Sequence, residues 1–108
     1  MNIENIQVQM RKGILEYCIL SIISDGEVYA SDILEQLKAA KLIVVEGTLY
    51  PLLTRLKNNE LLSYSWKESE SGPPRKYYTL TEKGKEIHKV MHDTWKDLEH
   101  AVKTTNKK

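Results

Sequence analysis

The fold is decided by the stretch Gly47-Thr48-Leu49-Tyr50-Pro51-Leu52-Leu53-Thr54-Arg55-Leu56-Lys57-Asn58. Its leucines, at positions 49, 52, 53 and 56, follow the i, i+3, i+4, i+7 spacing of one buried helical stripe. Pro51 is tolerated only in the first turn of a helix, where its missing N–H would have no intrahelical partner. The sequence therefore predicts an amphipathic helix that begins between Val45 and Thr48.

The outer face of this helix carries hydroxyl-bearing, aromatic and basic side chains. A short helix of this kind suits the major groove of DNA, which it enters with its N-terminal end. The predicted contacts to base edges or groove walls are Thr48, Tyr50, Pro51 and Arg55, with Lys57 on a phosphate. The alternative from this helix alone is an ordinary surface helix whose leucines are core and whose charges face water.

Length and composition point to one globular domain. The 108 residues allow a modest core, and a partner subunit would help the chain bury more apolar surface. Hydrophobic residues make up 41% and charged residues 29%, which excludes a disordered chain. No apolar run is long enough to cross a bilayer and the N-terminus lacks a signal-peptide pattern, so we expect a cytoplasmic protein without a membrane partner. A net charge of +1 requires any basic surface to be local.

Two helices are predicted before this stretch. The first spans Ile6 to Ile23 with a wide apolar face and ends at Asp25-Gly26, because glycine readily takes the left-handed conformation found beyond helix ends. The second spans Tyr29 to Lys41. The β-branched run from Leu42 to Val45 predicts a brief strand or an extended link. Two short helices joined this closely are a candidate helix-turn-helix.

A β-hairpin is predicted after the helix-turn-helix. Apolar and polar residues alternate from Leu62 to Lys67, residues 68–74 contain serines, a glycine and two prolines typical of a turn, and a second strand follows from Arg75 to Leu80. This arrangement places Arg75 and Lys76 near the tip of the hairpin. Helix, helix and hairpin in this order is the layout of a winged helix.

If the protein binds DNA, the basic residues of the hairpin are predicted to contact the DNA backbone. Phosphate contacts position such proteins and come chiefly from arginine and lysine, so Arg75 and Lys76 are predicted to reach the backbone or the minor groove. The alternative is a winged helix whose hairpin and helix dock onto a protein. The near-neutral net charge is the best support for this alternative.

Residues from Thr81 to Lys103 predict the last and longest helix, followed by a basic tail. Its apolar stripe needs a cover that the small core does not supply, so we expect it to pack against the first helix of a second subunit. The predicted dimer interface comprises Val8, Ile14, Leu15, Ile87, Met91, Trp95, Leu98 and Val102. The predicted fold class is mainly α with a small β-hairpin, divided into a winged helix-turn-helix domain (1–80) and a dimerisation helix with its tail (81–108).

Trp95 is the predicted centre of a ligand site. An aromatic ring near a two-fold axis meets its symmetry mate and can sandwich a flat apolar molecule. Met91 and Ile14 are also predicted to line this site, and Asp97 would favour a cationic compound. The alternative is that Trp95 simply fills the dimer core.

Neither a metal, a cofactor nor catalysis is predicted. His88 and His92 have the i, i+4 spacing of two zinc ligands, but no cysteine, histidine or carboxylate completes a site in the local sequence. Cys18 falls inside an apolar helical pattern and is expected to be core. The sequence has no phosphate-binding glycine loop, no nucleophile elbow and no tightly paired acids, so we expect a protein that is not an enzyme.

Three groups of residues resemble the PadR family of bacterial transcriptional regulators. They are Arg11-Lys12-Gly13, the run Gly47 to Leu53 with Arg55-Leu56, and the run Pro74 to Tyr78 with Leu80-Thr81 and Gly84. The resemblance covers nearly the whole chain, and the short length with one C-terminal helix is similar to the compact, multidrug-responsive subgroup. It implies a homodimeric winged-helix repressor on pseudo-palindromic, double-stranded operator DNA. A planar aromatic ligand between the subunits would release the DNA, because Trp95 matches a tryptophan that lines such a site in a drug-binding relative.

Three positions depart from the pattern of this family. Ala30-Ser31 stands where members often carry glycine and an aromatic residue, Val45 replaces a serine or asparagine cap, and Glu60 replaces a glycine. The missing cap would weaken the helix start by on the order of 1 kcal/mol. Without glycine at position 60, we expect Asn58 or Asn59 to take any left-handed turn.

Overall fold

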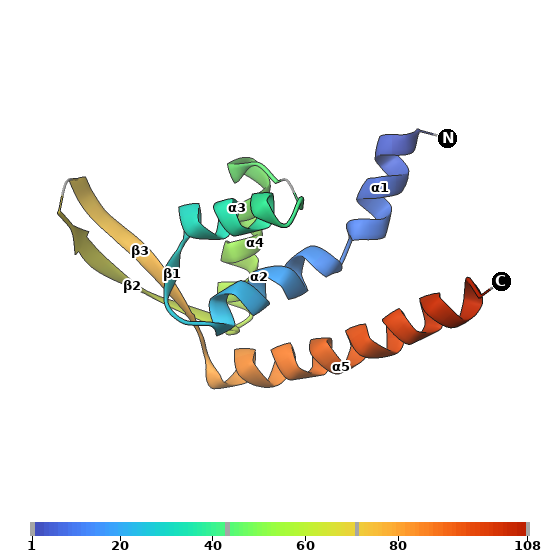
Figure 1. Cartoon of the computed structure of the whole chain (residues 1–108). Helices are drawn as coiled ribbons and strands as arrows, with labels where there is room; N and C mark the ends of the chain where they lie inside the picture. The colour runs from blue at the N-terminus through green and yellow to red at the C-terminus, as the bar shows by residue number, and fades with distance from the viewer. Residues whose placement is uncertain (1, 43, 71, 108) are drawn as a thin grey trace.

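The computed structural model describes residues 2–42, 44–70 and 72–107 of the chain (Figure 1). The elements are α1 (Ile3–Arg11), α2 (Ile14–Ser24), β1 (Val28–Tyr29), α3 (Ala30–Ala39), α4 (Glu46–Asn58), β2 (Leu62–Ser69), β3 (Gly72–Leu80) and α5 (Glu82–Thr105). Helices α2, α3 and α4 pack together, β2 and β3 form the wing, and α5 runs along the base of the molecule (Figure 1). The predicted fold class, a winged helix-turn-helix with a long C-terminal helix, is confirmed. Within the described residues, every helix is too short or too polar to cross a bilayer.

The core is formed by the facing sides of α2, α3 and α4. Leu49, Leu53 and Leu56 of α4 are almost fully buried, as the leucine spacing predicts, whereas Leu52, the fourth leucine of the predicted stripe, is only half-buried. The other members of the buried cluster are Ile19, Leu20, Ile23, Ala30, Ile33, Leu37, Leu61, Leu62 and Tyr78. Each leucine or isoleucine buried to this extent contributes about 1.5–3 kcal/mol. Their burial fixes the rotation of α4 and therefore which of its side chains face outward.

The sheet has three antiparallel strands in the order β1-β3-β2. β1, which was not predicted, pairs with β3 through Val28 opposite Tyr78 and Tyr29 opposite Tyr77. A two-residue strand shows no alternation in the sequence, so only its tertiary partner identifies it. Of the two possibilities predicted for Leu42 to Val45, a strand was wrong for the described residues, because Leu42, Val44 and Val45 form a link without strand pairing; Ile43 lies outside the described residues. Leu42 and Val44 pack against the core.

The first predicted helix was wrong in extent, because it is two helices. Lys12 has an extended backbone (ψ 126°), and Gly13 has φ 91°, a conformation that glycine adopts most easily. The apolar periodicity continues across this break, which hides it in the sequence. The described residues of α1 include none that is buried, whereas α2 contributes three residues to the core.

The predicted turn of the hairpin was too long. β2 extends to Ser69 and β3 begins at Gly72, so both prolines lie inside β3. The register of β2 and β3 passes from Lys67 opposite Arg75 to Ser69 opposite Gly72 with an irregularity between them, so the two prolines stand where the strand pairing is interrupted. Consequently, Arg75 and Lys76 lie opposite Lys67 and Trp66 and not at the tip.

The left-handed residue after α4 is Glu60 (φ 65°), so the expectation for Asn58 or Asn59 was wrong. The Leu61 N–H donates to the Leu56 carbonyl (3.0 Å) and the Glu60 N–H to the Lys57 carbonyl (2.9 Å). These two bonds form a Schellman motif, which requires the left-handed conformation at the residue after the C-cap Asn59. The hydrogen-bond pattern, and not the residue type, therefore decides which residue bends.

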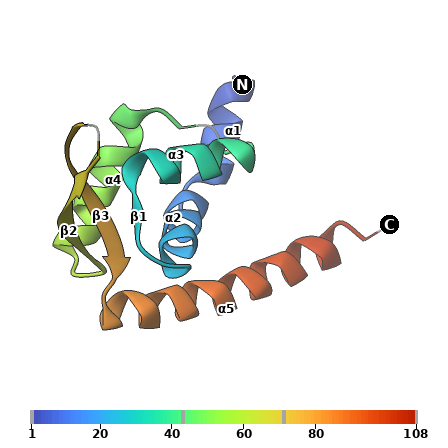
Figure 2. The same cartoon turned by 60° about the vertical axis from the view of Figure 1, so that its left-hand side comes forward.

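α5 is anchored at its first turn. The Thr81 Oγ1 accepts a hydrogen bond from the Gly84 N–H (2.9 Å) and donates to the Glu60 carbonyl (2.6 Å). Gly84 is buried against the backbone of Leu61, so the start of α5 is held to the turn that ends α4. From there α5 crosses α2 and extends beyond it (Figure 2).

Gly84→Ala is expected to destabilise the protein by about 1–3 kcal/mol, because the added Cβ would overlap the backbone carbonyl of Leu61. The matched control is Gly47→Ala in α4, where the added Cβ meets open space and alanine gains about 1 kcal/mol of helix propensity. Urea unfolding followed by circular dichroism measures both. Equal stability of the two variants would contradict the close packing of α5 on Leu61.

Candidate nucleic-acid interface

A groove of about 480 Å³ lies between α4 and the wing. The residues that line it are Tyr29, Ala30 and Ser31 at the start of α3, Tyr50 and Thr54 of α4, and Trp66, Arg75, Lys76 and Tyr78 of the wing. We call it the wing groove. It brings together three of the predicted DNA contacts, Tyr50, Arg75 and Lys76.

The leucine stripe of α4 positions the helical side of this groove. With Leu49 and Leu53 buried, Tyr50 and Thr54 project on the side of α4 that faces the wing, one turn apart. Pro51 is exposed and Lys57 lies with its amine 5.5 Å from the centre of the Tyr64 ring. Both predicted residues are therefore accessible on or beside the same face.

Aromatic rings hold the cations of the wing. The Lys76 amine lies 4.3 Å from the centre of the Tyr64 ring and 5.3 Å from that of Trp66, and the Arg75 guanidinium lies 4.7 Å from the centre of the Tyr29 ring. Each such contact contributes roughly 0.5–1 kcal/mol at an exposed site. Arg75 is exposed and Lys76 is half-buried, and the rings restrict where both cations point.

The floor of the wing groove is uncharged. Burial raises the pKa of the Tyr78 hydroxyl, and the nearby Tyr50 and Tyr64 hydroxyls raise it further. Tyr78 therefore remains protonated near neutral pH, and the charge of the groove comes from its lysine and arginine. Burial also raises the pKa of the Cys18 thiol, which packs against the core as the sequence predicts.

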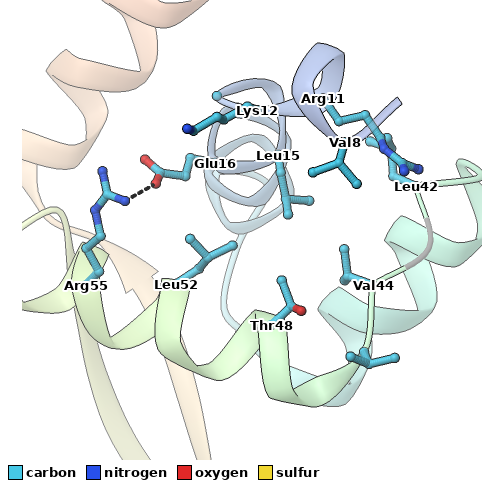
Figure 3. Close-up of a pocket in the computed structure, with 12 residues that line it drawn as sticks. Val8, Arg11, Lys12, Leu15, Glu16, Leu42, Val44, Thr48, Leu52 and Arg55 are labelled. Carbon is cyan, nitrogen blue, oxygen red and sulfur yellow. Dashed lines mark ion pairs between the residues drawn. The ribbon is translucent and has the colours of Figure 1, made fainter. Parts of the chain in front are cut away.

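Two further predicted contacts lie on the other side of α4. Thr48 and Arg55 face α1 and α2 across a second hollow, and Arg55 Nη1 lies 3.1 Å from Glu16 Oε1 (Figure 3). The structure thus separates the predicted DNA-contacting residues into two groups. Sequence reasoning missed Thr54 and Trp66, although the alternation along β2 already placed Trp66 on one face with Tyr64.

Three of the four predicted ligand residues come together. Ile14, Met91 and Trp95 line a hollow of about 270 Å³ between α2 and α5, together with Tyr17 and Leu98. Asp97 is exposed on α5 and lies outside the described lining of this hollow.

Of the eight residues predicted for a dimer interface, Ile14 and Trp95 line this hollow and the other six fall into two groups. Leu15, Ile87 and Met91 pack against the core of their own chain. Val8, Leu98 and Val102 are exposed. The second group is available to a partner, and the first is already partly used by the fold.

The two histidines of α5 contact α2. His88 Nε2 lies 2.9 Å from Ser21 Oγ, and His92 Nδ1 lies 3.0 Å from the Tyr17 hydroxyl. Because Ser21 Oγ donates its hydrogen to the Tyr17 carbonyl (2.9 Å), His88 donates to Ser21. No cluster of three or more metal-ligating side chains occurs in the part of the chain that the structure describes.

A helix-turn-helix core with a basic, aromatic wing beside its second short helix defines the winged-helix class of regulators. The model of the transcriptional regulator PadR-like family matches residues 19–89. The chain belongs to this family, which confirms the resemblance seen in its sequence.

Solved structures agree with this assignment. A PadR-like transcription factor from Bacteroides fragilis is 57% identical, with 94% of this chain and 98% of that chain covered and a TM-score of 0.78. A PadR-like transcriptional regulator from Bacillus cereus is 39% identical, with 93% and 98% covered and a TM-score of 0.83. Bacillus subtilis PadR in complex with operator DNA is 24% identical, with 73% of this chain and 46% of that chain covered and a TM-score of 0.67, a likeness of fold alone.

Proposed function

We propose that this regulator is a homodimeric repressor that binds pseudo-palindromic operator DNA through the wing groove. The observation that carries the proposal is the convergence of Tyr50 and Thr54 of α4 with Arg75 and Lys76 of the wing on one accessible groove. A relative of the same fold, Bacillus subtilis PadR, has been crystallised with operator DNA, which supports the same use of the fold here.

The outward face of α4 enters the major groove. Tyr50, Pro51 and Thr54 approach base edges or groove walls, while the ring-held cations Arg75 and Lys76 approach phosphates or the minor groove. Lys57 flanks this face, and Thr48 and Arg55 remain predicted contacts at its α2 side. In a dimer, two copies of α4 require half-sites about 10 bp apart or a multiple of this.

Arg75→Gln is expected to weaken binding to a duplex from upstream of the protein's own gene by about three- to tenfold and to reduce the salt slope of log K by about 1, because one phosphate contact is lost. Fluorescence anisotropy at several salt concentrations measures both. The matched control is Lys103→Gln, a cation at the far end of α5, which is expected to bind as the wild type does.

Binding to the upstream duplex that does not depend on salt, or equal affinity for scrambled DNA, would contradict the proposal that the protein is a repressor. Either result would favour the alternative function, a winged helix that docks onto a protein through an apolar face.

The second subunit covers apolar surface on α1 and α5. Met10 is 77% exposed, Ile3 is 72% exposed and Leu98 is 50% exposed. Apolar side chains gathered on two helices in this way mark a protein interface. We infer that α5 of one subunit packs on α1 of the other, so that residues 81–108 dimerise and residues 1–80 bind DNA.

Leu98→Asp is expected to shift the dimer to a monomer, because it would bury an unpaired carboxylate in the interface. Light scattering coupled to size-exclusion chromatography measures the mass at micromolar concentration. The control is His100→Asp on the opposite face of α5, which adds the same charge and is expected to leave the dimer intact. A monomeric wild type would overturn the dimer.

A planar aromatic compound beside Trp95 relieves repression. Ile14 of α2 and Met91 of α5 already form a hollow with Trp95, and α2 also carries core residues behind α4. A compound that binds better to an arrangement with different wing separation shifts the dimer away from DNA. This role, together with membership of the compact multidrug-responsive subgroup, rests on the resemblance of Trp95 to the tryptophan of a drug-binding relative.

In a Trp66→Tyr variant, a panel of planar aromatic dyes is expected to include members that quench Trp95 fluorescence saturably. Trp66 must be removed because it is the other tryptophan of the chain and, being 62% exposed, would contribute its own fluorescence signal. The control is a Trp95→Phe variant that keeps Trp66, in which saturable quenching is expected to be lost. If no dye of the panel quenches Trp95 saturably, the site is wrong.

A further inference from the structure

The hollow on the side of α4 away from the wing shares Thr48 and Arg55 with the predicted DNA contacts, and it adds an aliphatic lining that those contacts do not use. Its volume is about 520 Å³, within the range of small-molecule sites. α1 contributes Val8, α2 contributes Leu15, the segment before α4 contributes Leu42 and Val44, and α4 contributes Leu52 and Thr48 (Figure 3). We call it the α1–α4 hollow.

The walls of the α1–α4 hollow are aliphatic. Among the lining residues that the structure describes, none carries an aromatic ring. Leu15, Leu42, Val44 and Leu52 also pack against the core, so these walls are held in place by the folded domain. Branched aliphatic walls without a ring on which to stack favour an aliphatic body over a flat aromatic one.

The rim of the α1–α4 hollow is basic. Arg11, Lys12 and Arg55 lie there with a single acid, Glu16. Glu16 is paired with Arg55 and is 21% exposed in its side chain, whereas that of Arg55 is 65% exposed. Three cations against one carboxylate leave an excess of positive charge that suits an anion, and the guanidinium fork matches a carboxylate in particular.

We propose that the α1–α4 hollow binds an aliphatic monocarboxylate. The hydrocarbon chain lies against Leu15, Val44 and Leu52, and the carboxylate pairs with Arg55 in place of Glu16. Apolar burial supplies most of the affinity, and the ion pair sets the orientation and the preference for an acid.

A ligand in the α1–α4 hollow affects the proposed DNA-binding face because it contacts α4. Thr48, Leu52 and Arg55 all belong to this helix, and the Arg55–Glu16 pair joins it to α2. A bound carboxylate replaces that link and places negative charge beside the helix that enters the major groove of the negatively charged DNA, so it weakens operator binding. This regulatory half of the inference rests on the proposed function.

Isothermal titration of the full-length protein with octanoate tests the site without DNA. Arg55→Gln is expected to weaken octanoate binding about five- to tenfold, because it removes the charged partner. Glu16→Gln is expected to tighten it about two- to fivefold, because Arg55 no longer has a competing carboxylate. Arg75→Gln, a matched loss of an arginine on the wing, is expected to leave it unchanged.

Ligand chemistry supplies a second comparison in the wild type. Octylamine, which has the same chain and the opposite charge, is expected to bind more weakly than octanoate, and so is benzoate, which has the same charge on an aromatic ring. Absence of saturable octanoate binding, equal binding by Arg55→Gln and the wild type, or tighter binding of benzoate overturns the assignment of the site.

Anisotropy with the operator duplex then tests regulation. Saturating octanoate is expected to weaken DNA binding of the wild type at least threefold and that of Glu16→Gln at a lower concentration. Calorimetric binding with unchanged DNA affinity overturns the regulatory half alone. If the protein shows no specific DNA binding even without octanoate, the proposed function fails, and the calorimetric comparison still decides the site.

Discussion

The structure depends on burial of the leucine stripe of α4 against α2 and α3. Because Leu49, Leu53 and Leu56 are almost completely removed from water, α4 has one favourable rotation about its axis. That rotation divides its remaining surface into two sides. Tyr50 and Thr54 face the wing, while Thr48 and Arg55 face α1 and α2. The two hollows that flank α4, one basic and aromatic and the other aliphatic with a basic rim, are consequences of the same packed stripe.

The wing and the long helix are tied to the two ends of this arrangement. β3 is held at its base, where Tyr78 is buried and β1 and β2 pair on either side, and it projects beyond β1 toward the tip. Immediately after β3, Thr81 and Gly84 attach α5 to the Glu60–Leu61 turn that ends α4. A change in the position of α5 therefore bears on the end of α4 and the root of the wing together, which supports a link between the proposed dimer interface and the proposed DNA-binding surface.

Elements with a strong periodic signal were predictable, and those defined by a single backbone conformation were not. The bounds of α4 and α5 and the existence of the hairpin follow from spacing and from turn residues. The break at Gly13 lies inside a continuous apolar pattern, because a positive φ at one glycine leaves the period on either side unchanged. Glu60 was also not predictable from periodicity, because it takes the left-handed conformation that a Schellman motif requires at its position. Side-chain partners such as Glu16 for Arg55 are separated in sequence and appear only after folding.

By itself, the sequence determined the helical and strand composition, the winged order of the elements, the core leucines and the family resemblance, because each is written in local spacing or in motifs. Tertiary structure decided how the predicted functional residues are grouped. It placed Tyr50 with Arg75 and Lys76, moved Thr48 and Arg55 to the opposite side of α4, and gathered Ile14, Met91 and Trp95 between α2 and α5. The physical reason is that periodicity specifies which side of a helix is buried, whereas the neighbours of its exposed sides are set by how separate elements pack against one another.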